Sequence, residues 1–315
     1  MAISQVQKKP QLNIESITWG ELTWVNIEKP TANETRYLAE HYPFHPLDLD
    51  DVLSRIQRPK IDEYEDYLFL VFHFPVYQKA RRVLASSQLS VFIGEKYLIT
   101  LHSGELKPLV KLFRECQIDE ESPPEYLGSG SGFLLYRILD RLVDYCLPIL
   151  NKVLDNIEEV EDDIFADQRK DTVRAISMLR RDIISFRRII WPMRAVIGSL
   201  EPRVRRFISK DMSVYFGDMI DHMDKIWDAL DEYKEIIEGL SATYDSLSSN
   251  RTNEVVRILT IIATILLPIT VVASIYGMNI PLPFQETEYS FLYVVLIMAV
   301  IIGGILYFFR RIRVI

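Results

Sequence analysis

ILTIIATILLPITVVASIY, from Ile258 to Tyr276, is a run of 19 residues without a charged side chain. A second uncharged run of the same length, FLYVVLIMAVIIGGILYFF, covers Phe291 to Phe309. About 20 apolar residues carry a helix across the hydrocarbon core of a bilayer. Soluble cores seldom contain two such runs separated by so short a loop. The sequence therefore predicts a C-terminal hairpin of two transmembrane helices at 258–276 and 291–309.

The charges beside these two runs predict their orientation. Five arginines lie on the side away from the connecting loop: Arg251, Arg257, Arg310, Arg311 and Arg313. The loop, Gly277 to Ser290, has no Lys or Arg and contains Glu286 and Glu288. Because positive charge favours the cytoplasmic side, both chain ends are expected in the cytoplasm and the loop outside.

The rest of the chain is acidic. Hydrophobic residues make up 49% and charged residues 25% of the 315, which argues against a disordered or wholly membrane-embedded protein. The 250 residues before Arg251 carry 31 basic and 41 acidic groups, whereas residues 251–315 have a net charge of +2. An acidic body argues against nucleic acid as a partner, because phosphates are bound by basic patches. It suits a cationic partner.

Several other functional classes receive no support from the sequence. Cys116 and Cys146 form no CxxC pair, so reduced thiols are expected rather than a zinc site or a disulfide. The N-terminus has no apolar segment typical of a cleaved signal peptide. Walker A, GxGxxG and HExxH motifs are absent, so we expect no enzyme, no organic cofactor and no ATP-driven pump.

Residues 1–122 are predicted to form an α/β domain. The expected strands are rich in β-branched and aromatic residues: Leu22–Ile27, Tyr67–Tyr77, Leu89–Gly94 and Lys96–His102. Helical patterns cover 31–42, with Thr31 or Asn33 as N-cap, and also 46–56 and 105–117. The Pro- and Gly-containing segment 122–132 is expected to be a linker or a helix start.

Residues 123–210 are predicted to be a helical region. One helix is expected over 132–165 and a second over about 172–200, both from apolar residues at steps of three and four. A third helix, predicted for 211–276, meets no proline before Pro268 in the first apolar run. It would be roughly 100 Å long at about 1.5 Å per residue. One chain cannot cover such a rod, so self-association is expected.

The first apolar run carries a stripe of mostly small or hydroxylated residues. Steps of three and four from Asn253 give Val256, Thr260, Ala263, Leu267, Thr270, Ser274 and Gly277. By itself this pattern favours a helix-packing face over a pore lining. Two spans per chain cannot enclose an aqueous path, so a pore would require a ring of several chains.

Tyr276-Gly277-Met278-Asn279 stands at the end of this run, and here the chain resembles the CorA family of divalent-cation channels. The signature of that family is Gly-Met-Asn after the first of two C-terminal spans. The likeness covers nearly the whole chain. It includes Arg188–Ile197 (RIIWPMRAVI), Tyr215–His222 (YFGDMIDH) and Ser249–Thr270.

The resemblance implies an α+β cytosolic domain, long helices and the C-terminal hairpin, assembled as a funnel-shaped homopentamer. The first span would then line the pore and the second would lie outside it. Gly277, Met278 and Asn279 would form the selectivity filter. Lower in the pore, the resemblance implies a second polar ring at Asn253 and a hydroxyl ring at Thr270. Leu259 and Leu267 are candidates for apolar constrictions. Mg²⁺ dehydrates reluctantly, so neutral amides can select it through its bound waters.

Two parts of the family pattern are altered in this chain. Ala242 stands where the family often has an acid, although Asp245 lies nearly one turn later. The outer loop of much of the family reads MPEL, whereas here it reads IPLPFQE from Ile280 to Glu286. Glu286 and Glu288 are candidates for attracting cations at the mouth, with a solvated loop as the alternative. For the regulatory Mg²⁺ site that the family places between subunits, Asp218 matches the helix partner. Asp221 and His222 are further candidate ligands, but solvated surface residues are the simpler interpretation. The segment 76–87 has no acid to supply the other partner.

The sequence thus predicts passive, potential-driven Mg²⁺ uptake across a prokaryotic plasma membrane, with Co²⁺ and Ni²⁺ as further candidate ions. Zinc transport with the same fold, coupled to protons, is one alternative. A membrane-anchored sensor or scaffold without flux is another. The expected partners are divalent cations, the lipid bilayer and further copies of the chain. Domain boundaries are predicted at 1–122, 123–210, 211–276, 277–290, 291–309 and 310–315.

Overall fold

The computed structural model describes residues 12–54, 57–78, 83–119, 122–166, 171–278 and 289–312. The strands are β1 (Ile14–Trp19), β2 (Leu22–Glu28), β3 (Lys60–Glu63), β4 (Tyr67–Gln78), β5 (Val83–Gly94) and β6 (Tyr97–His102). The helices are α1 (Ala32–His41), α2 (Pro46–Leu53), α3 (Lys107–Ile118), α4 (Ser122–Leu127), α5 (Ser131–Asp144), α6 (Cys146–Ala166), α7 (Thr172–Gly198), α8 (Glu201–Val204), α9 (Ser213–Tyr276) and α10 (Ser290–Arg311). A short 3₁₀ helix covers Arg205–Phe207.

The strands form one six-stranded sheet in the order β1-β2-β6-β5-β4-β3. β2 and β6 pair in parallel, and the other neighbours pair antiparallel. The parallel pair brings the first part of the chain beside residues about 75 positions later, with Asn26 opposite Thr100 and Glu28 opposite His102. This register positions the buried polar network described below.

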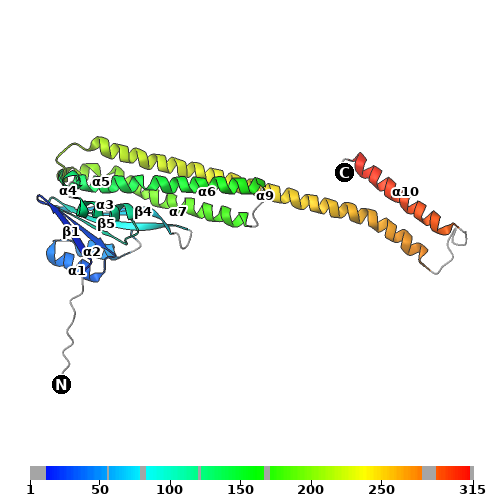
Figure 1. Ribbon diagram of the computed structural model, residues 1–315, viewed down its shortest axis with the longest axis horizontal. Helices are drawn as coiled ribbons and strands as arrows, with labels where there is room; N and C mark the ends of the chain where they lie inside the picture. The colour runs from blue at the N-terminus through cyan, green and yellow to red at the C-terminus, as the bar shows by residue number, and fades with distance from the viewer. Residues whose placement is uncertain are drawn as a thin grey trace, which may run out of the picture. The chain divides into compact units, whose positions relative to one another are not determined.

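Both faces of the sheet are covered, and the residues of β4 show this most clearly. Alternate strand residues point to opposite faces. Tyr67, Phe69 and Val71 join a core with side chains of α1 and α2. Leu68, Leu70 and Phe72 are equally buried on the other face, and α5, α6 and α7 contact the strands (Figure 1). The α/β prediction is therefore confirmed as a three-layer arrangement.

Two strands were missed by the sequence analysis, and both lie at the edges of the sheet. β1 and β3 are only partly buried, and polar residues interrupt their apolar ones, so neither shows the apolar run that marked the central strands. β5 also begins six residues before the predicted strand, with Ala85, Ser86 and Ser87 continuing the ladder to β4. Composition alone thus failed to show the two edge strands and the polar start of β5.

The single helix expected over 132–165 was wrong. Two helices occupy this segment, because α5 ends at Asp144 and α6 begins at Cys146. Pro148 has no N–H to donate to the carbonyl of Asp144, and its ring crowds that carbonyl. It therefore lies in the first turn of a new helix. The predicted second helix is confirmed as α7.

Helix starts agree with the capping expected from the sequence. Thr31 is the N-cap of α1, and its side chain and that of Glu34 form a capping box. The segment 122–132 contains α4 and the start of α5 rather than an open linker. α2 ends at Leu53, and residues 55 and 56 of the predicted helix lie outside the described residues.

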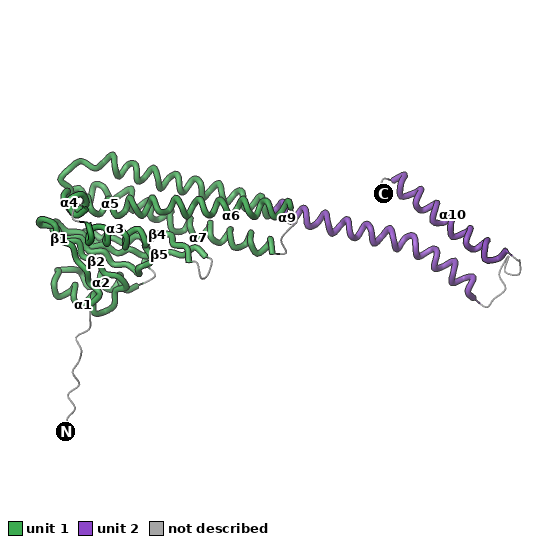
Figure 2. Tube along the Cα trace, in the orientation of Figure 1, with its two compact units in different colours: residues 1–241 green, residues 242–315 purple. Residues whose placement is uncertain are grey.

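α9 is one helix of 64 residues, which confirms the long helix predicted from the sequence. The chain divides into two compact units, residues 1–241 and 242–315, so the division falls within α9 (Figure 2). α9 and α10 are both long and apolar enough to cross a membrane. The uncharged runs of the sequence lie within these two helices.

Candidate functional site

The first half of α9 packs against its own chain. It buries eight residues at alternating steps of three and four: Phe216, Met219, Met223, Ile226, Leu230, Tyr233, Ile237 and Leu240. Salt bridges join the same half to α7, from Arg187 to Asp231 and from Arg194 to Asp224. Such a seam holds a helix by its apolar face.

The second half of α9 has no buried residue among 242–276. Val256 is 54% exposed, and Leu259 and Leu267 are each 65% exposed. Within this half, residues 258–276 carry no charge and are mostly apolar, and such a helix requires lipid or other helices as its environment. In this half, the stripe beginning at Asn253 is as uncovered as the apolar side chains around it.

Hydroxyl groups in this half bond to their own helix. The Oγ1 atoms of Thr260, Thr264 and Thr270 donate to the carbonyl oxygens of Val256, Thr260 and Leu266 at 2.8, 2.8 and 2.9 Å. A hydroxyl that donates its only proton keeps two acceptor lone pairs. Thr270 therefore offers an acceptor to a group that carries protons, such as the water shell of a hydrated cation.

The end of α9 lies at the Gly-Met-Asn segment. The Gly277 N–H donates to the Ala273 carbonyl at 2.9 Å, and the Met278 N–H to the Ile275 carbonyl at 3.2 Å. A Cβ added at Gly277 would come within 3.2 Å of the Ala273 oxygen, so glycine suits this close turn. Asn279, Glu286 and Glu288 lie outside the described residues.

The candidate regulatory residues lie on α9 beside α5. His222 Nε2 is 3.9 Å from Asp218 Oδ2, and His222 Nδ1 is 3.4 Å from Asp144 Oδ1. Sequence analysis missed Asp144 and its neighbour Asp140, whose pKa is raised by burial and by Asp144. Asp140 and Asp144 are four residues apart, so the sequence could have placed them on one polar side of α5. Only the fold shows that this side lies next to His222.

A complete metal site is not formed by these side chains in one chain. Among the described residues, no three His, Cys, Asp or Glu side chains are grouped to hold a metal ion, and this includes Asp218, Asp221 and His222. In the segment 76–87, β4 and β5 remain paired up to Gln78 and Val83, and residues 79–82 lie outside the described residues.

Known proteins similar to this chain agree with the fold. The family model for "CorA-like Mg2+ transporter protein" matches residues 19–311. The cobalt/magnesium transport protein CorA of Thermotoga maritima is 33% identical, with 92% of this chain and 82% of that protein covered. A structure of the CorA magnesium transporter from Methanocaldococcus jannaschii superposes with a TM-score of 0.81 at 26% identity, over 94% of this chain and 92% of that one.

A more distant relative transports a different ion. The zinc transport protein ZntB of Klebsiella pneumoniae is 20% identical over 308 residues, which cover 96% of this chain and 91% of that protein. The same overall sequence pattern is therefore shared by proteins named for different divalent cations.

Proposed function

The chain belongs to the family of CorA-like Mg²⁺ transporter proteins, and we propose that it forms a passive channel for Mg²⁺ uptake. In this proposal several copies, as a homopentamer, surround one pore in a prokaryotic plasma membrane. The α/β domain and both chain ends lie in the cytoplasm, as the flanking arginines indicate. The membrane potential supplies about 2.3 kcal/mol per charge per 100 mV, and twice as much for a divalent ion. No nucleotide hydrolysis is required.

The observation that carries the proposal is the uncovered second half of α9. Residues 242–276 bury no side chain within the chain, yet they combine an apolar span with a polar stripe. In a ring of chains, the stripe would face a shared axis and the remaining apolar side chains would face α10 helices and lipid. The proposed pore lining is this stripe (Asn253, Val256, Thr260, Ala263, Leu267, Thr270, Ser274 and Gly277) together with Leu259, which precedes Thr260.

Selection of the ion is assigned to Gly277, Met278 and Asn279 at the outer end of α9. Mg²⁺ keeps most of its water shell, so a ring of Asn279 amides can bind those waters without removing them. Asn253 and Thr270 would supply further acceptors along the path. Neutral acceptors hold a divalent ion less tightly than carboxylates, which lets the ion leave again.

Gating is assigned to two apolar rings and to divalent cations in the cytoplasm. Leu259 and Leu267 are both exposed on the proposed lining and could close the pore by excluding water. Asp218 would bind a regulatory Mg²⁺ with a group from a neighbouring chain, since the described residues of its own chain form no complete site. Glu286 and Glu288 would raise the cation concentration at the outer mouth.

The zinc relative defines the main competing function. Zinc is bound by His, Cys and carboxylate groups, and coupling to protons requires groups that titrate. Residues 258–275 contain no Asp, Glu, His, Cys, Lys or Arg. This composition favours Mg²⁺ over a zinc transporter that coordinates its ion within the span.

The proposal is tested by uptake into proteoliposomes under an inside-negative potential, with Mg²⁺, Co²⁺ and Zn²⁺ compared in the presence and absence of a proton gradient. We expect Mg²⁺ entry that follows the voltage, ignores the proton gradient and is lost in Asn279→Ala while the oligomer remains assembled. Asn33→Ala, an equal change on an exposed position of α1, serves as the control. Zinc entry that follows the proton gradient would instead assign the chain to zinc transport. A folded oligomer without flux would favour a sensor or scaffold.

A further inference from the structure

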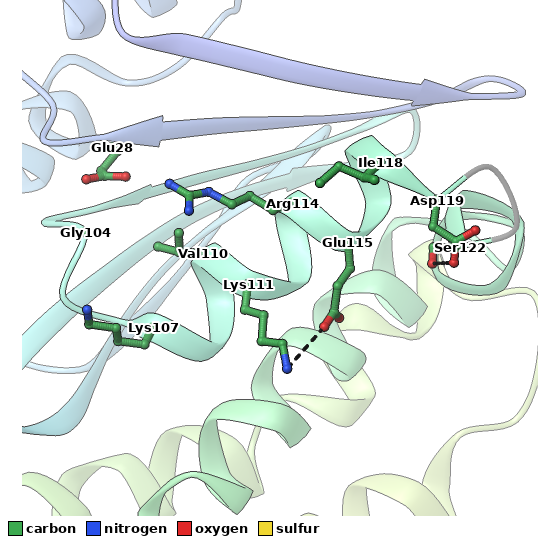
Figure 3. Close-up of a pocket in the computed structure, with 10 residues that line it drawn as sticks. All are labelled: Glu28, Gly104, Lys107, Val110, Lys111, Arg114, Glu115, Ile118, Asp119 and Ser122. Atoms are coloured by element: carbon green, nitrogen blue, oxygen red, sulfur yellow. Dashed lines mark hydrogen bonds and ion pairs between the residues drawn. The ribbon is translucent and has the colours of Figure 1, made fainter.

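An open groove of about 720 Å³ lies along α3 in the α/β domain (Figure 3). Its lining includes three basic side chains of α3: Lys107, Lys111 and Arg114. They recur at steps of four and three, so they share one side of the helix. Pockets for small molecules are commonly 300–1,000 Å³. The groove thus has the volume for a small ligand, and its three basic side chains share the lining with three acids, Glu28, Glu115 and Asp119.

Two of these cations have no ion-pair partner among the residues that the structure describes. Among the described residues, neither Lys107 nor Arg114 forms a salt bridge, and Lys111 is only 3.7 Å from Glu115. Lys107 is also the first residue of α3, whose first turn contains no acid. A cation is disfavoured at the positive end of a helix, whereas an anion is stabilised there. A bound anion would therefore compensate two charges that have no ion-pair partner in the described part of the chain.

The acids that line the same groove are mostly engaged elsewhere. Glu115 accepts two hydrogen bonds from Arg141, at 2.8 and 3.2 Å. Asp119 accepts one from Ser122 at 2.8 Å, at the far end of the groove. Glu28 is 3.5 Å from Lys29, and in Figure 3 Arg114 extends from α3 towards the strand end where Glu28 lies. Glu28 would oppose a bound anion near Arg114, and so would Glu15, which lines an adjoining pocket with Arg114 and accepts from Gln117 Nε2 at 2.9 Å.

A buried amide donor lies in a smaller adjoining pocket of about 150 Å³, which shares Glu28, Val110 and Arg114 with the groove. Asn26 lines this pocket and is only 7% exposed. Its Oδ1 accepts from Thr100 Oγ1 at 2.8 Å and from His102 Nε2 at 3.0 Å. Within the described part of the chain its Nδ2 makes no hydrogen bond to protein, so this donor is accessible to solvent or to a ligand in the pocket.

We propose that this groove binds a phosphorylated small molecule of mononucleotide size. The phosphate groups contact Arg114, Lys107 and the Asn26 amide, because guanidinium, ammonium and N–H groups are the donors that phosphate oxygens accept from. Val110 and Ile118 supply apolar contact for the organic part. The inference goes beyond ion conduction and does not depend on which cation is transported.

Binding is measured by calorimetry on the full-length chain in detergent micelles, with ADP and inorganic pyrophosphate as probes. Divalent cations are removed with EDTA, so that chelation of Mg²⁺ does not contribute heat. We expect saturable binding of ADP, competition by pyrophosphate, and weaker competition by orthophosphate. Removing one charge-assisted contact in Arg114→Gln should weaken binding about tenfold. Lys107→Gln should weaken binding in the same direction and serves as a second variant.

Two further variants separate this site from general attraction of anions. Glu28→Gln removes an opposing charge and should raise the affinity for ADP. If Glu28 had a purely structural role, the affinity would not rise. Arg36→Gln makes the same charge change as Arg114→Gln at an exposed position of α1 and should leave the affinity unchanged. Absence of saturable binding at millimolar ADP, or equal losses in Arg36→Gln and Arg114→Gln, would overturn the proposal.

Discussion

The two halves of α9 are built from one continuous helix and differ in what covers them. From Phe216 to Leu240 the helix presents a regular apolar seam to its own chain, and the side chains of that seam are buried. From Ala242 to Tyr276 the helix is more apolar, yet it buries none. A single chain thus buries the apolar face of the first half of α9 but not that of the second half.

This difference separates the part of α9 that is packed within its own chain from the part that would be covered only in the proposed assembly. The seam of the first half is a stability feature, since its side chains lie in a packed interior. The second half buries no side chain against its own chain, and in the proposed ring the bilayer and neighbouring copies would cover it. Substitutions in the two halves should therefore affect different measurements.

The largest effect is expected from truncating a seam residue. Leu230 is fully buried, so Leu230→Ala should lower the free energy of unfolding of the α/β domain and its helices by about 2–5 kcal/mol. Leu267→Ala, at a leucine of the same helix that is 65% exposed, should leave that free energy unchanged. Denaturant unfolding followed by circular dichroism compares the two variants. Equal losses would mean that both halves are packed by their own chain.

Acid should destabilise the first unit through His102. Its Nε2 donates to Asn26 and its Nδ1 accepts from the Gly104 N–H at 3.0 Å, so both ring nitrogens are satisfied in the neutral form. Burial lowers the pKa of His102 to about 4, below the ordinary value of 6.5. The folded state therefore binds fewer protons than the unfolded state between these values. Stability is fully present above about pH 6.5 and falls by about 3 kcal/mol as the pH drops to 4.

Equilibrium unfolding from pH 7 to pH 4 checks this slope, and His102→Gln should reduce it. Burial also lowers the pKa of His73, so a smaller slope of the same sign should remain in the variant. The helix content of residues 242–276 should be insensitive to this change, because neither histidine lies in that unit. A slope unaltered by His102→Gln would contradict the assignment.

The smallest effect is expected from removing one hydroxyl in the second half. Thr270→Val should lower Mg²⁺ flux several-fold, because an acceptor on the polar stripe is lost. Thr264→Val is the matched control, since its hydroxyl also bonds to its own helix and its side chain points about 120° away. Proteoliposome flux compares them, and neither variant should alter the unfolding of the first unit. An equal loss of flux in both would mean that the stripe is not the lining.

Sequence reasoning succeeded where periodicity extends over many residues. The central strands, α7 and the whole of α9 follow from runs of apolar residues or from spacing of three and four. It failed where the signal is local or weak, at the edge strands β1 and β3 and at the break before Cys146. Pro148 was visible in the sequence, and its position in a first turn explains the break.

The candidate sites differ in the same way. The stripe on α9 could be predicted because its members are neighbours along one helix. The network of Asn26, Thr100 and His102 joins strands about 75 residues apart, so only the parallel pairing of β2 with β6 brings it together. The groove beside α3 depends on that pairing as well. Residues 79–82 and 279–288 lie outside the described residues, so the roles proposed for Asn279, Glu286 and Glu288 stay predictions from the sequence.

The central claim, that the stripe on the second half of α9 lines the ion path, is tested most directly by cysteine substitution. Ser274→Cys lies on the stripe, and Val272→Cys lies about 160° away on the same helix. Both native cysteines are buried, so a membrane-impermeant cationic thiol reagent should leave the unsubstituted channel active. We predict that the reagent blocks Mg²⁺ flux in Ser274→Cys and leaves flux intact in Val272→Cys. Block of Val272→Cys with Ser274→Cys unaffected would contradict the account.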